Sequence, residues 1–270
     1  MTDIQFSPYE VFSPSMNMAI DEYYLKFGTG INVRLYGWTP AAISIGRSQN
    51  VEQVVDIPFC AENGIPIVRR STGGGAVYHK NDITYMVSAP ISVFQDRSVV
   101  GMYKEIANHL LKTLKKIGIP CHFAGAVSPE ERRTSLKQGL ACFLLPSDYE
   151  ILAQSRKLVG SAQHRESTRM LQHGSIAWNF DYEETAACLR TTSENLQERV
   201  ASMNHFVPTL SVEAVQEALL QTLETAKFRI VRADSALSSV NQEKVIELMK
   251  DFPLQLGRQR NENSLRLKEN

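Results

Sequence analysis

Residues 69–79 read RRSTGGGAVYH, and this stretch decides how the rest of the chain is interpreted. Two arginines and two hydroxyl side chains precede three consecutive glycines, and a short apolar run then ends at His79. A single glycine usually marks a turn with a positive φ angle. Three in a row leave several backbone amides without a shielding Cβ atom, and such amides can donate to a carbonyl or a phosphate. The stretch therefore predicts a ligand close to the main chain, without identifying it.

Composition and motifs exclude several classes of protein. The chain has 270 residues, with 29 basic and 29 acidic side chains, which argues against binding nucleic acid by phosphate neutralisation. No G-x-x-x-x-G-K-[ST] is present, and GGGAVYH does not open a helix as G-x-G-x-x-G does. The N-terminus has no secretory signal, and no run of ~20 apolar residues occurs. The four cysteines have no zinc spacing. We therefore expect a cytoplasmic protein with reduced thiols, no metal and no membrane partner.

Hydrophobic spacing and turn residues predict the order of the secondary structure. A first helix is expected over 17–27, with Ser15 as its N-cap and Gly28 as its stop. Other helices are expected over 56–64 and 102–117, and a helix, a strand and a helix are expected after residue 211. Strands are expected over 33–38, 41–47, 66–70, 76–78, 82–89, 149–153, 157–163 and 170–178. This mixed order predicts an α+β fold with mostly antiparallel sheets flanked by helices.

Several segments, in a fixed order, resemble the lipoate–protein ligase and octanoyltransferase family, whose catalytic fold is shared with biotin–protein ligases. The segments are RRSTGGGAVYH, NMAIDEYYL (17–25), SIGRSQN (44–50), RKLVGSAQHR (156–165) and LQHGSI (171–176). The resemblance covers roughly residues 15–180. It implies a biotin/lipoate-ligase-like catalytic domain over residues 1–210, with residues 211–270 as a short extension packed on it. In that family the glycine-rich strand forms one wall of an acyl tunnel.

The resemblance also implies a set of residues around the substrate. Backbone amides near 74–77 or 160–162 are expected to stabilise an oxyanion, and His173 is expected to shape the pocket rather than to act as a base. The implied binding residues are Arg70, Ser71, Thr72, Gly73, Gly74, Gly75, Ala76, Val77, Tyr78, His79, Gly160, Ser161, Ala162, Gln163, His173 and Gly174.

Residues 141–150, ACFLLPSDYE, resemble the C-F-x-x-P-S-x-Y-E segment of the cysteine-dependent lipoyl(octanoyl) transferases of Gram-positive bacteria. The resemblance implies that Cys142 carries the acyl group and that Lys157 lies beside it. A nearby ammonium would increase the thiolate fraction of a thiol whose ordinary pKa is ~8.5. Thiolate attack on an acyl thioester exchanges one thioester for another and needs no ATP. Lys157 could relay the proton if an apolar tunnel lowers its pKa.

The function implied is transfer of an octanoyl group, without a cofactor, from octanoyl-acyl carrier protein through Cys142 to a lipoyl domain. The expected acceptor is the glycine cleavage H protein, and the enzyme is expected to be a monomer. Three alternatives stay open: an ATP-dependent lipoate ligase, an amidotransferase acting between lipoyl domains, and a non-catalytic acyl-binding protein. The basic segment 128–139 is either a solvated loop or a contact for an acidic partner.

Overall fold

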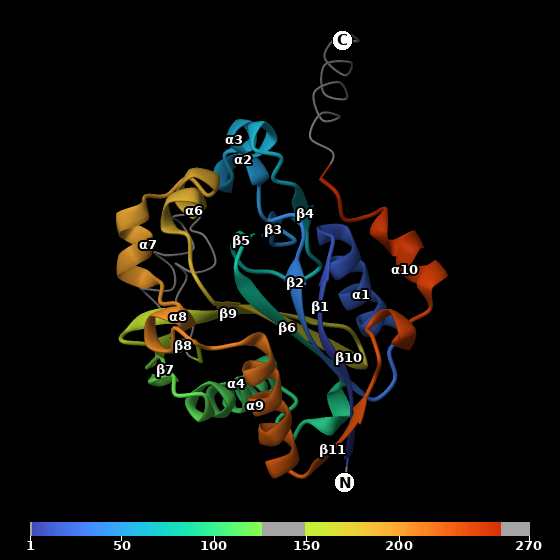
Figure 1. Cartoon of the computed structure of the whole chain (residues 1–270). Coiled ribbons are helices and arrows are strands. Elements are labelled where there is room, and N and C mark those ends of the chain that lie inside the picture. Colours follow the sequence, from blue (N-terminus) through green and yellow to red (C-terminus); the bar gives the residue numbers. More distant parts are fainter. Residues whose placement is uncertain (1, 126–148, 255–270) are drawn as a thin grey trace, which may run out of the picture.

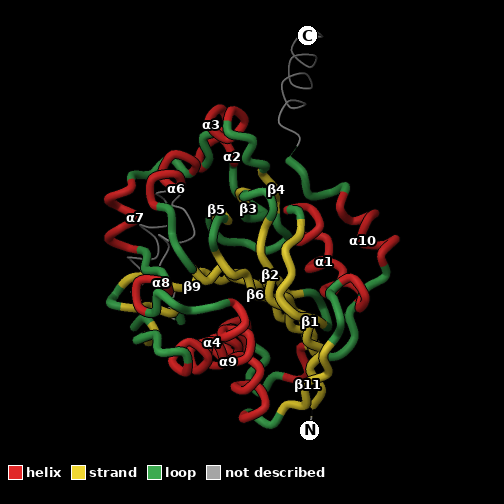
Figure 2. Tube along the Cα trace, viewed as in Figure 1, coloured by secondary structure: helices red, strands yellow, loops and turns green. Residues whose placement is uncertain are grey.

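Two β-sheets organise the computed structural model, which describes residues 2–125 and 149–254 (Figures 1 and 2). Within these residues the larger sheet has the strand order β11-β1-β2-β6-β10-β9-β8-β7 and the smaller has the order β4-β3-β5. The larger sheet comprises β1 (Thr2–Phe12), β2 (Ile31–Trp38), β6 (Asp82–Pro90), β7 (Cys121–Phe123), β8 (Ile151–Ala153), β9 (Arg156–Arg165), β10 (Arg169–Ala177) and β11 (Phe228–Arg232). The smaller comprises β3 (Ala42–Ile45), β4 (Ile67–Arg69) and β5 (Val77–His79).

Most strand pairs of the larger sheet are antiparallel. The pairs β2–β6, β6–β10, β10–β9, β9–β8 and β8–β7 are antiparallel, whereas β1 lies parallel to both β2 and β11. The smaller sheet pairs β3 parallel with β4 and antiparallel with β5. The expected α+β fold with mostly antiparallel pairing is confirmed.

Helices cover both faces of the larger sheet (Figure 1). The core on one face joins the sheet to α4 (Val99–Lys116) and α9 (Val212–Thr225). The core on the other face joins it to α1 (Pro14–Phe27) and α10 (Gln242–Met249). Since successive strand residues face opposite ways, Tyr85 belongs to the first core and Met86 to the second.

The remaining helices are short. A third core packs the smaller sheet against α3 (Ile57–Glu62), α6 (Tyr182–Cys188) and α7 (Ser193–Arg199). The other short elements are α2 (Val51–Val54), α8 (Met203–Phe206), η1 (Ile91–Val93) and η3 (Leu237–Ser239). Across the described residues, no helix has both the length and the apolar character needed to cross a membrane.

Local sequence signals predict helices α1 and α4, but they place the N-cap of α1 at the wrong residue. The helix expected over 102–117 is α4, and its stripe of Ile106, Leu110 and Leu114 is buried as expected. The predicted N-cap Ser15 is wrong. Ser13 caps α1 by accepting from the amide of Met16, because Pro14 has no amide of its own and fits the first turn. The stop at Gly28 is confirmed.

Elements after residue 211 form the expected helix, strand and helix, namely α9, β11 and α10. They attach to distant parts of the chain: β11 pairs with β1, α9 contacts α4, and α10 contacts α1. Strand β1 and helices α6, α7 and α8 were not predicted. Pro8 interrupts the sequence pattern of β1, and the structure accommodates it at a register shift between Ser7 and Glu10.

Candidate active site

A pocket lies between the two sheets and is closed on one side by α1. Eight of the residues expected to bind substrate line it, which brings together segments far apart in the sequence. They are Arg70, Val77, His79, Gly160, Ser161, Ala162, His173 and Gly174. Residues that were not predicted complete the wall: Met18, Tyr36, Trp38, Ser44, Thr84 and Ser175.

Arg70 holds the segment Gly73–Gly75, which we call the glycine loop. Its Nη2 donates to the carbonyl oxygens of Gly73 and Gly75, both at 2.7 Å. Its Nη1 donates to the carbonyl and the hydroxyl oxygen of Ser44, at 3.0 and 3.2 Å. Its Nε donates to Thr72 Oγ1 at 3.1 Å. Because the side chain is buried, this guanidinium fixes the path of the loop from inside the protein.

The glycines serve a turn and a close approach of two backbones. Gly74 has a φ of +89°, a conformation that residues with a Cβ atom rarely adopt. A Cβ on Gly46 would lie 2.1 Å from the carbonyl oxygen of Gly74. The amide of Arg47 also donates to the carbonyl of Thr72 at 2.9 Å. The glycine loop is therefore packed directly against the turn that follows β3.

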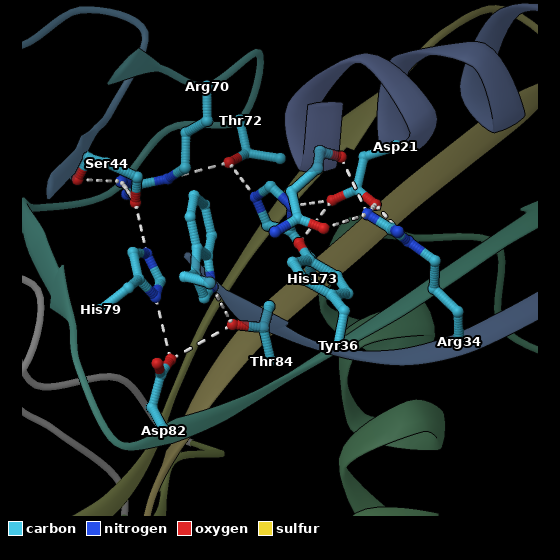
Figure 3. Close-up of polar contacts among 12 residues, drawn as sticks. Asp21, Arg34, Tyr36, Ser44, Arg70, Thr72, His79, Asp82, Thr84 and His173 are labelled. Carbon is cyan, nitrogen blue, oxygen red and sulfur yellow. Dashed lines mark hydrogen bonds and ion pairs between the residues drawn. The ribbon is translucent and has the colours of Figure 1, made fainter. Parts of the chain in front are cut away.

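A buried chain of hydrogen bonds joins α1 to this loop (Figure 3). Asp21 Oδ2 lies 2.7 Å from His173 Nδ1, and His173 Nε2 lies 2.7 Å from Thr72 Oγ1. Arg34 donates to Asp21 Oδ1 from Nε and Nη2, at 3.0 and 2.9 Å. The hydroxyl of Tyr36 donates to Asp21 Oδ2 at 2.8 Å. Asp21, Arg34 and His173 are all buried, so this chain is shielded from water.

The two titratable residues of this hydrogen-bond chain, Asp21 and His173, have shifted pKa values. Burial alone would raise the pKa of Asp21, but the charge of Arg34 and the hydrogen bonds from His173 and Tyr36 hold it below its usual value. Burial lowers the pKa of His173, although Asp21 works in the opposite direction. Asp21 is therefore charged and His173 neutral at pH 7. Since a carboxylate only accepts, Nδ1 of His173 carries the proton and Nε2 accepts from Thr72.

A second chain of the same kind reaches Arg70 from the other side of the pocket (Figure 3). His79 Nδ1 lies 2.9 Å from Asp82 Oδ2, and His79 Nε2 lies 2.8 Å from Ser44 Oγ. Asp82 Oδ2 also accepts from Ser175 at 2.7 Å. The ring of His79 stacks on Trp38, with centroids 3.9 Å apart. His79 is thus a fixed wall of the pocket.

Lys157 is buried on β9 and forms an ion pair with Glu150. An irregular pairing follows Lys157 on β9, because Ile151 pairs with Val159 whereas Leu152 pairs with Lys157. Leu158 is the extra residue, and Leu158 and Val159 both belong to the core under α4. The extra residue turns Lys157 to the opposite face, which also carries Gly160 and Ala162.

Two expectations fall on residues outside the described ranges. Cys142 and the basic segment 128–139 lie there, so the proximity of Cys142 to Lys157 stays a prediction. Among residues 2–125 and 149–254, no three His, Cys, Asp or Glu side chains are grouped so that they could hold a metal ion.

Other predicted residues contact the protein interior instead of the pocket. Tyr78 and Ala76 belong to the core beneath α6, and burial raises the pKa of Tyr78 well above its usual range. The amide of Gln163 donates to Gln172 Oε1 at 3.1 Å. Ser161 lines the pocket, and its hydroxyl also accepts from the Tyr85 hydroxyl at 2.7 Å.

Residues 13–224 match the Lipoyl protein ligase A/B catalytic domain family. The chain belongs to this family. The resemblance inferred from the sequence motifs is thereby confirmed.

Relatives within the lipoyl protein ligase A/B family share much of the sequence. Octanoyltransferase LipM of Kyrpidia tusciae is 36% identical over 223 residues, which cover 77% of this chain and 81% of the relative. The protein of the same name from Moorella thermoacetica is 35% identical over 241 residues, covering 85% and 84%. A solved lipoate-protein ligase A bound with ATP matches with a TM-score of 0.73 at 24% identity, covering 93% and 95%. That structural match confirms the fold expected for the family.

Sequence reasoning missed the charged residues behind the pocket of this lipoyl protein ligase A/B domain. Asp21 and Arg34 are the clearest cases. Each is a charged residue within an apolar segment, NMAIDEYYL and NVRLYGW, and charged residues are rarely buried unless they are paired. Their positions therefore indicate that each charge is buried with a partner. The sequence alone does not show that Asp21 on a helix and Arg34 on a strand are each other's partners.

Proposed function

We propose that this octanoyltransferase moves an octanoyl group from octanoyl-acyl carrier protein to the lysine of a lipoyl domain, through a thioester on Cys142. Octanoyl transfer is the activity named for the family relatives that are 36% and 35% identical over most of the chain. The donor protein, the H protein as acceptor, the thioester, a monomeric state and a cytoplasmic location are parts of the proposal.

One observation supports the proposed site most strongly. Strand β9 supplies Gly160 and Ala162 to the pocket and carries the buried Lys157 on the same face. Glu150, which pairs with Lys157, belongs to the P-S-x-Y-E part of the segment that begins near Cys142. A nucleophile in that segment would have a cation and an apolar pocket close by.

The proposed chemistry needs no external energy source. The Cys142 thiolate attacks the thioester carbonyl of the donor, and the carrier protein leaves as a thiol after taking up a proton. The amine of the lipoyl-domain lysine then attacks the acyl-enzyme, an amide forms, and the Cys142 thiolate is released. Lys157 stabilises the thiolate and relays protons, while backbone amides beside the pocket stabilise the oxyanion.

The test is intact mass spectrometry after mixing the protein with octanoyl-acyl carrier protein in the absence of ATP. We expect one octanoyl group on the wild type and none on Cys142→Ala. Cys121→Ala is a control, because Cys121 is a buried core residue and its loss should leave the adduct in place. If lipoyl-domain modification instead requires ATP and free acid, and persists in Cys142→Ala, the protein is a ligase.

The acceptor is tested separately with purified lipoyl domains. We expect the acyl-enzyme to transfer its octanoyl group to the glycine cleavage H protein, and the mass of that protein to rise by one octanoyl group. Equal or faster transfer to the lipoyl domain of a 2-oxoacid dehydrogenase would contradict the assignment of the H protein as the preferred acceptor.

A further inference from the structure

We infer that Asp21 is a positioning residue for the transfer reaction, acting through His173 and Thr72 on Arg70 and the glycine loop. The inference rests on the proposed function in one respect only, namely that the glycine loop borders the acyl group during the reaction. The hydrogen-bond chain itself stands on the geometry of the buried residues.

With a neutral His173 ring, the hydrogen-bond chain has one arrangement of donors and acceptors. Asp21 accepts from His173 Nδ1 at 2.7 Å, so His173 Nε2 must accept from the Thr72 hydroxyl, also at 2.7 Å. The oxygen of Thr72 then accepts from Arg70 Nε at 3.1 Å. Its two ends are fixed, because a carboxylate only accepts and a guanidinium only donates. Asp21 therefore determines the ring tautomer, and through it the orientation of the Thr72 hydroxyl.

Asp21 is itself held in place. Arg34 donates two hydrogen bonds to its Oδ1, and the Arg34 guanidinium lies over the ring of Tyr36 at 3.9 Å from its centroid. Tyr36 donates to its Oδ2 at 2.8 Å. These contacts join α1 to β2, so the starting point of the chain is set by the packing of a helix on the sheet.

The chain ends on a guanidinium that is fixed from two sides. Thr72 binds Nε, and Ser44, which ends the parallel chain from Asp82 and His79, binds Nη1. Nη2 is then aimed at the carbonyl oxygens of Gly73 and Gly75, each at 2.7 Å. Orienting both carbonyls inward constrains where the amides of the same loop point, and the proposed function makes those amides donors to an acyl oxygen.

A direct catalytic role for the Asp21–His173–Thr72 chain does not fit its burial. The order carboxylate, imidazole and hydroxyl is that of a hydrolase triad. However, Thr72 is 0% exposed and Asp21 is 2% exposed, so no substrate carbonyl reaches the hydroxyl. The hydrogen-bond chain orients Arg70 and the glycine loop, and the reacting atoms lie elsewhere.

The tautomer is tested on the wild-type protein by ¹⁵N NMR of histidine-labelled enzyme. His173 is assigned by comparison with His173→Gln. We expect a neutral ring protonated on Nδ1 at pH 7 and a loss of this single tautomer in Asp21→Asn. An imidazolium, or a ring protonated on Nε2 in the wild type, would overturn the inference whatever the activity of the enzyme.

The positioning role is tested with two substitutions at one site. Thr72→Val keeps the shape and removes the hydroxyl, whereas Thr72→Ser keeps the hydroxyl. We expect kcat/KM for acylation by octanoyl-acyl carrier protein to fall about 10- to 100-fold in Thr72→Val and to recover in Thr72→Ser. We also expect Asp21→Asn to lower kcat more than it raises KM. Equal rates in Thr72→Val and wild type would refute the role.

Two controls keep this result separate from the proposed function and from misfolding. Absence of an octanoyl adduct on the wild type would count against the proposed function and would leave the tautomer measurement unaffected. Rates are compared at a temperature where circular dichroism shows each variant to be folded. If Thr72→Val does not fold at any temperature, Asp21→Asn and the wild-type tautomer decide the outcome.

Discussion

The contact between Gly46 and the glycine loop predicts the effect of adding a single methyl group. In Gly46→Ala the new Cβ would lie 2.1 Å from the carbonyl oxygen of Gly74 and 3.1 Å from the carbonyl carbons of Gly73 and Gly74. All three atoms belong to the backbone, so no side chain can rotate away. Since comfortable contacts between such atoms begin near ~3.5 Å, the turn and the loop must separate by about 1.4 Å.

That separation has a cost in stability and in activity. Overpacking of this kind destabilises proteins by about 1–3 kcal/mol. For a protein of this size each kcal/mol lowers the melting temperature by about 2–4 °C, so we expect a decrease of about 2–12 °C. A displacement of about 1 Å at a positioning segment lowers reaction rates by as much as about 100-fold. Gly46→Ala should therefore impair octanoyl transfer even at temperatures where it is fully folded.

The assay is thermal unfolding followed by circular dichroism, together with the rate of acylation by octanoyl-acyl carrier protein. Gly73→Ala is the matched control for stability, because a Cβ at Gly73 would have no atom within 4 Å. We expect its melting temperature to stay within about 2 °C of the wild type. If Gly46→Ala unfolds at the wild-type temperature, or if both substitutions destabilise equally, the close approach described here is not a constraint on the fold.

Three further predictions concern the buried charges. Arg34→Met should lower the free energy of unfolding by about 3–5 kcal/mol in urea titrations, because Asp21 is left buried without its cation; the double variant with Asp21→Asn should recover part of the loss. The free energy of unfolding should decrease on acidification below pH ~6.5, because burial lowers the pKa of His173 and the unfolded chain therefore takes up this proton first. A second decrease should follow below pH ~4 from Asp21, whose pKa in the folded protein is also depressed. Urea titrations at pH 5 and 7.5 measure this difference. His173→Gln should reduce the first component, to which His109 also contributes because burial lowers its pKa too. Glu150→Gln should lower the free energy of unfolding by about 1–3 kcal/mol, also measured by urea titration, because it replaces the charged partner of the buried Lys157. An unchanged urea midpoint would mean that this ion pair makes no net contribution to stability.

Local signals in the sequence were sufficient for much of the fold. The apolar stripe of α4 and the glycine that ends α1 are read from neighbouring residues alone, and both are observed. The pocket-lining Arg70, His79 and His173 were found because they lie within motifs of a known family. In each case the information needed was contained in a few consecutive residues.

Features that depend on distant partners could not be predicted. Asp21 meets His173 across 152 residues of chain, and Thr72 meets His173 across 101. The identity of these residues is visible in the sequence, but their pairing exists only once α1 and both sheets are assembled. The same reason explains β1, whose Pro8 is tolerated because its neighbours pair around a register shift. Long-range packing overrides a local signal in all these cases.

Strand β1 has a consequence for the order in which the protein can fold during synthesis. Its pairing with β2 is available once residue 38 has been made, but its other edge pairs with β11, where Thr2 lies opposite Phe228. At 5–20 residues per second, the ribosome needs roughly 10–40 s to reach β11. During that interval one edge of a strand bearing Ile4 and Phe6 has no neighbour, and open strand edges are sites of aggregation. The nascent chain should therefore be most dependent on chaperones between the synthesis of β2 and that of β11.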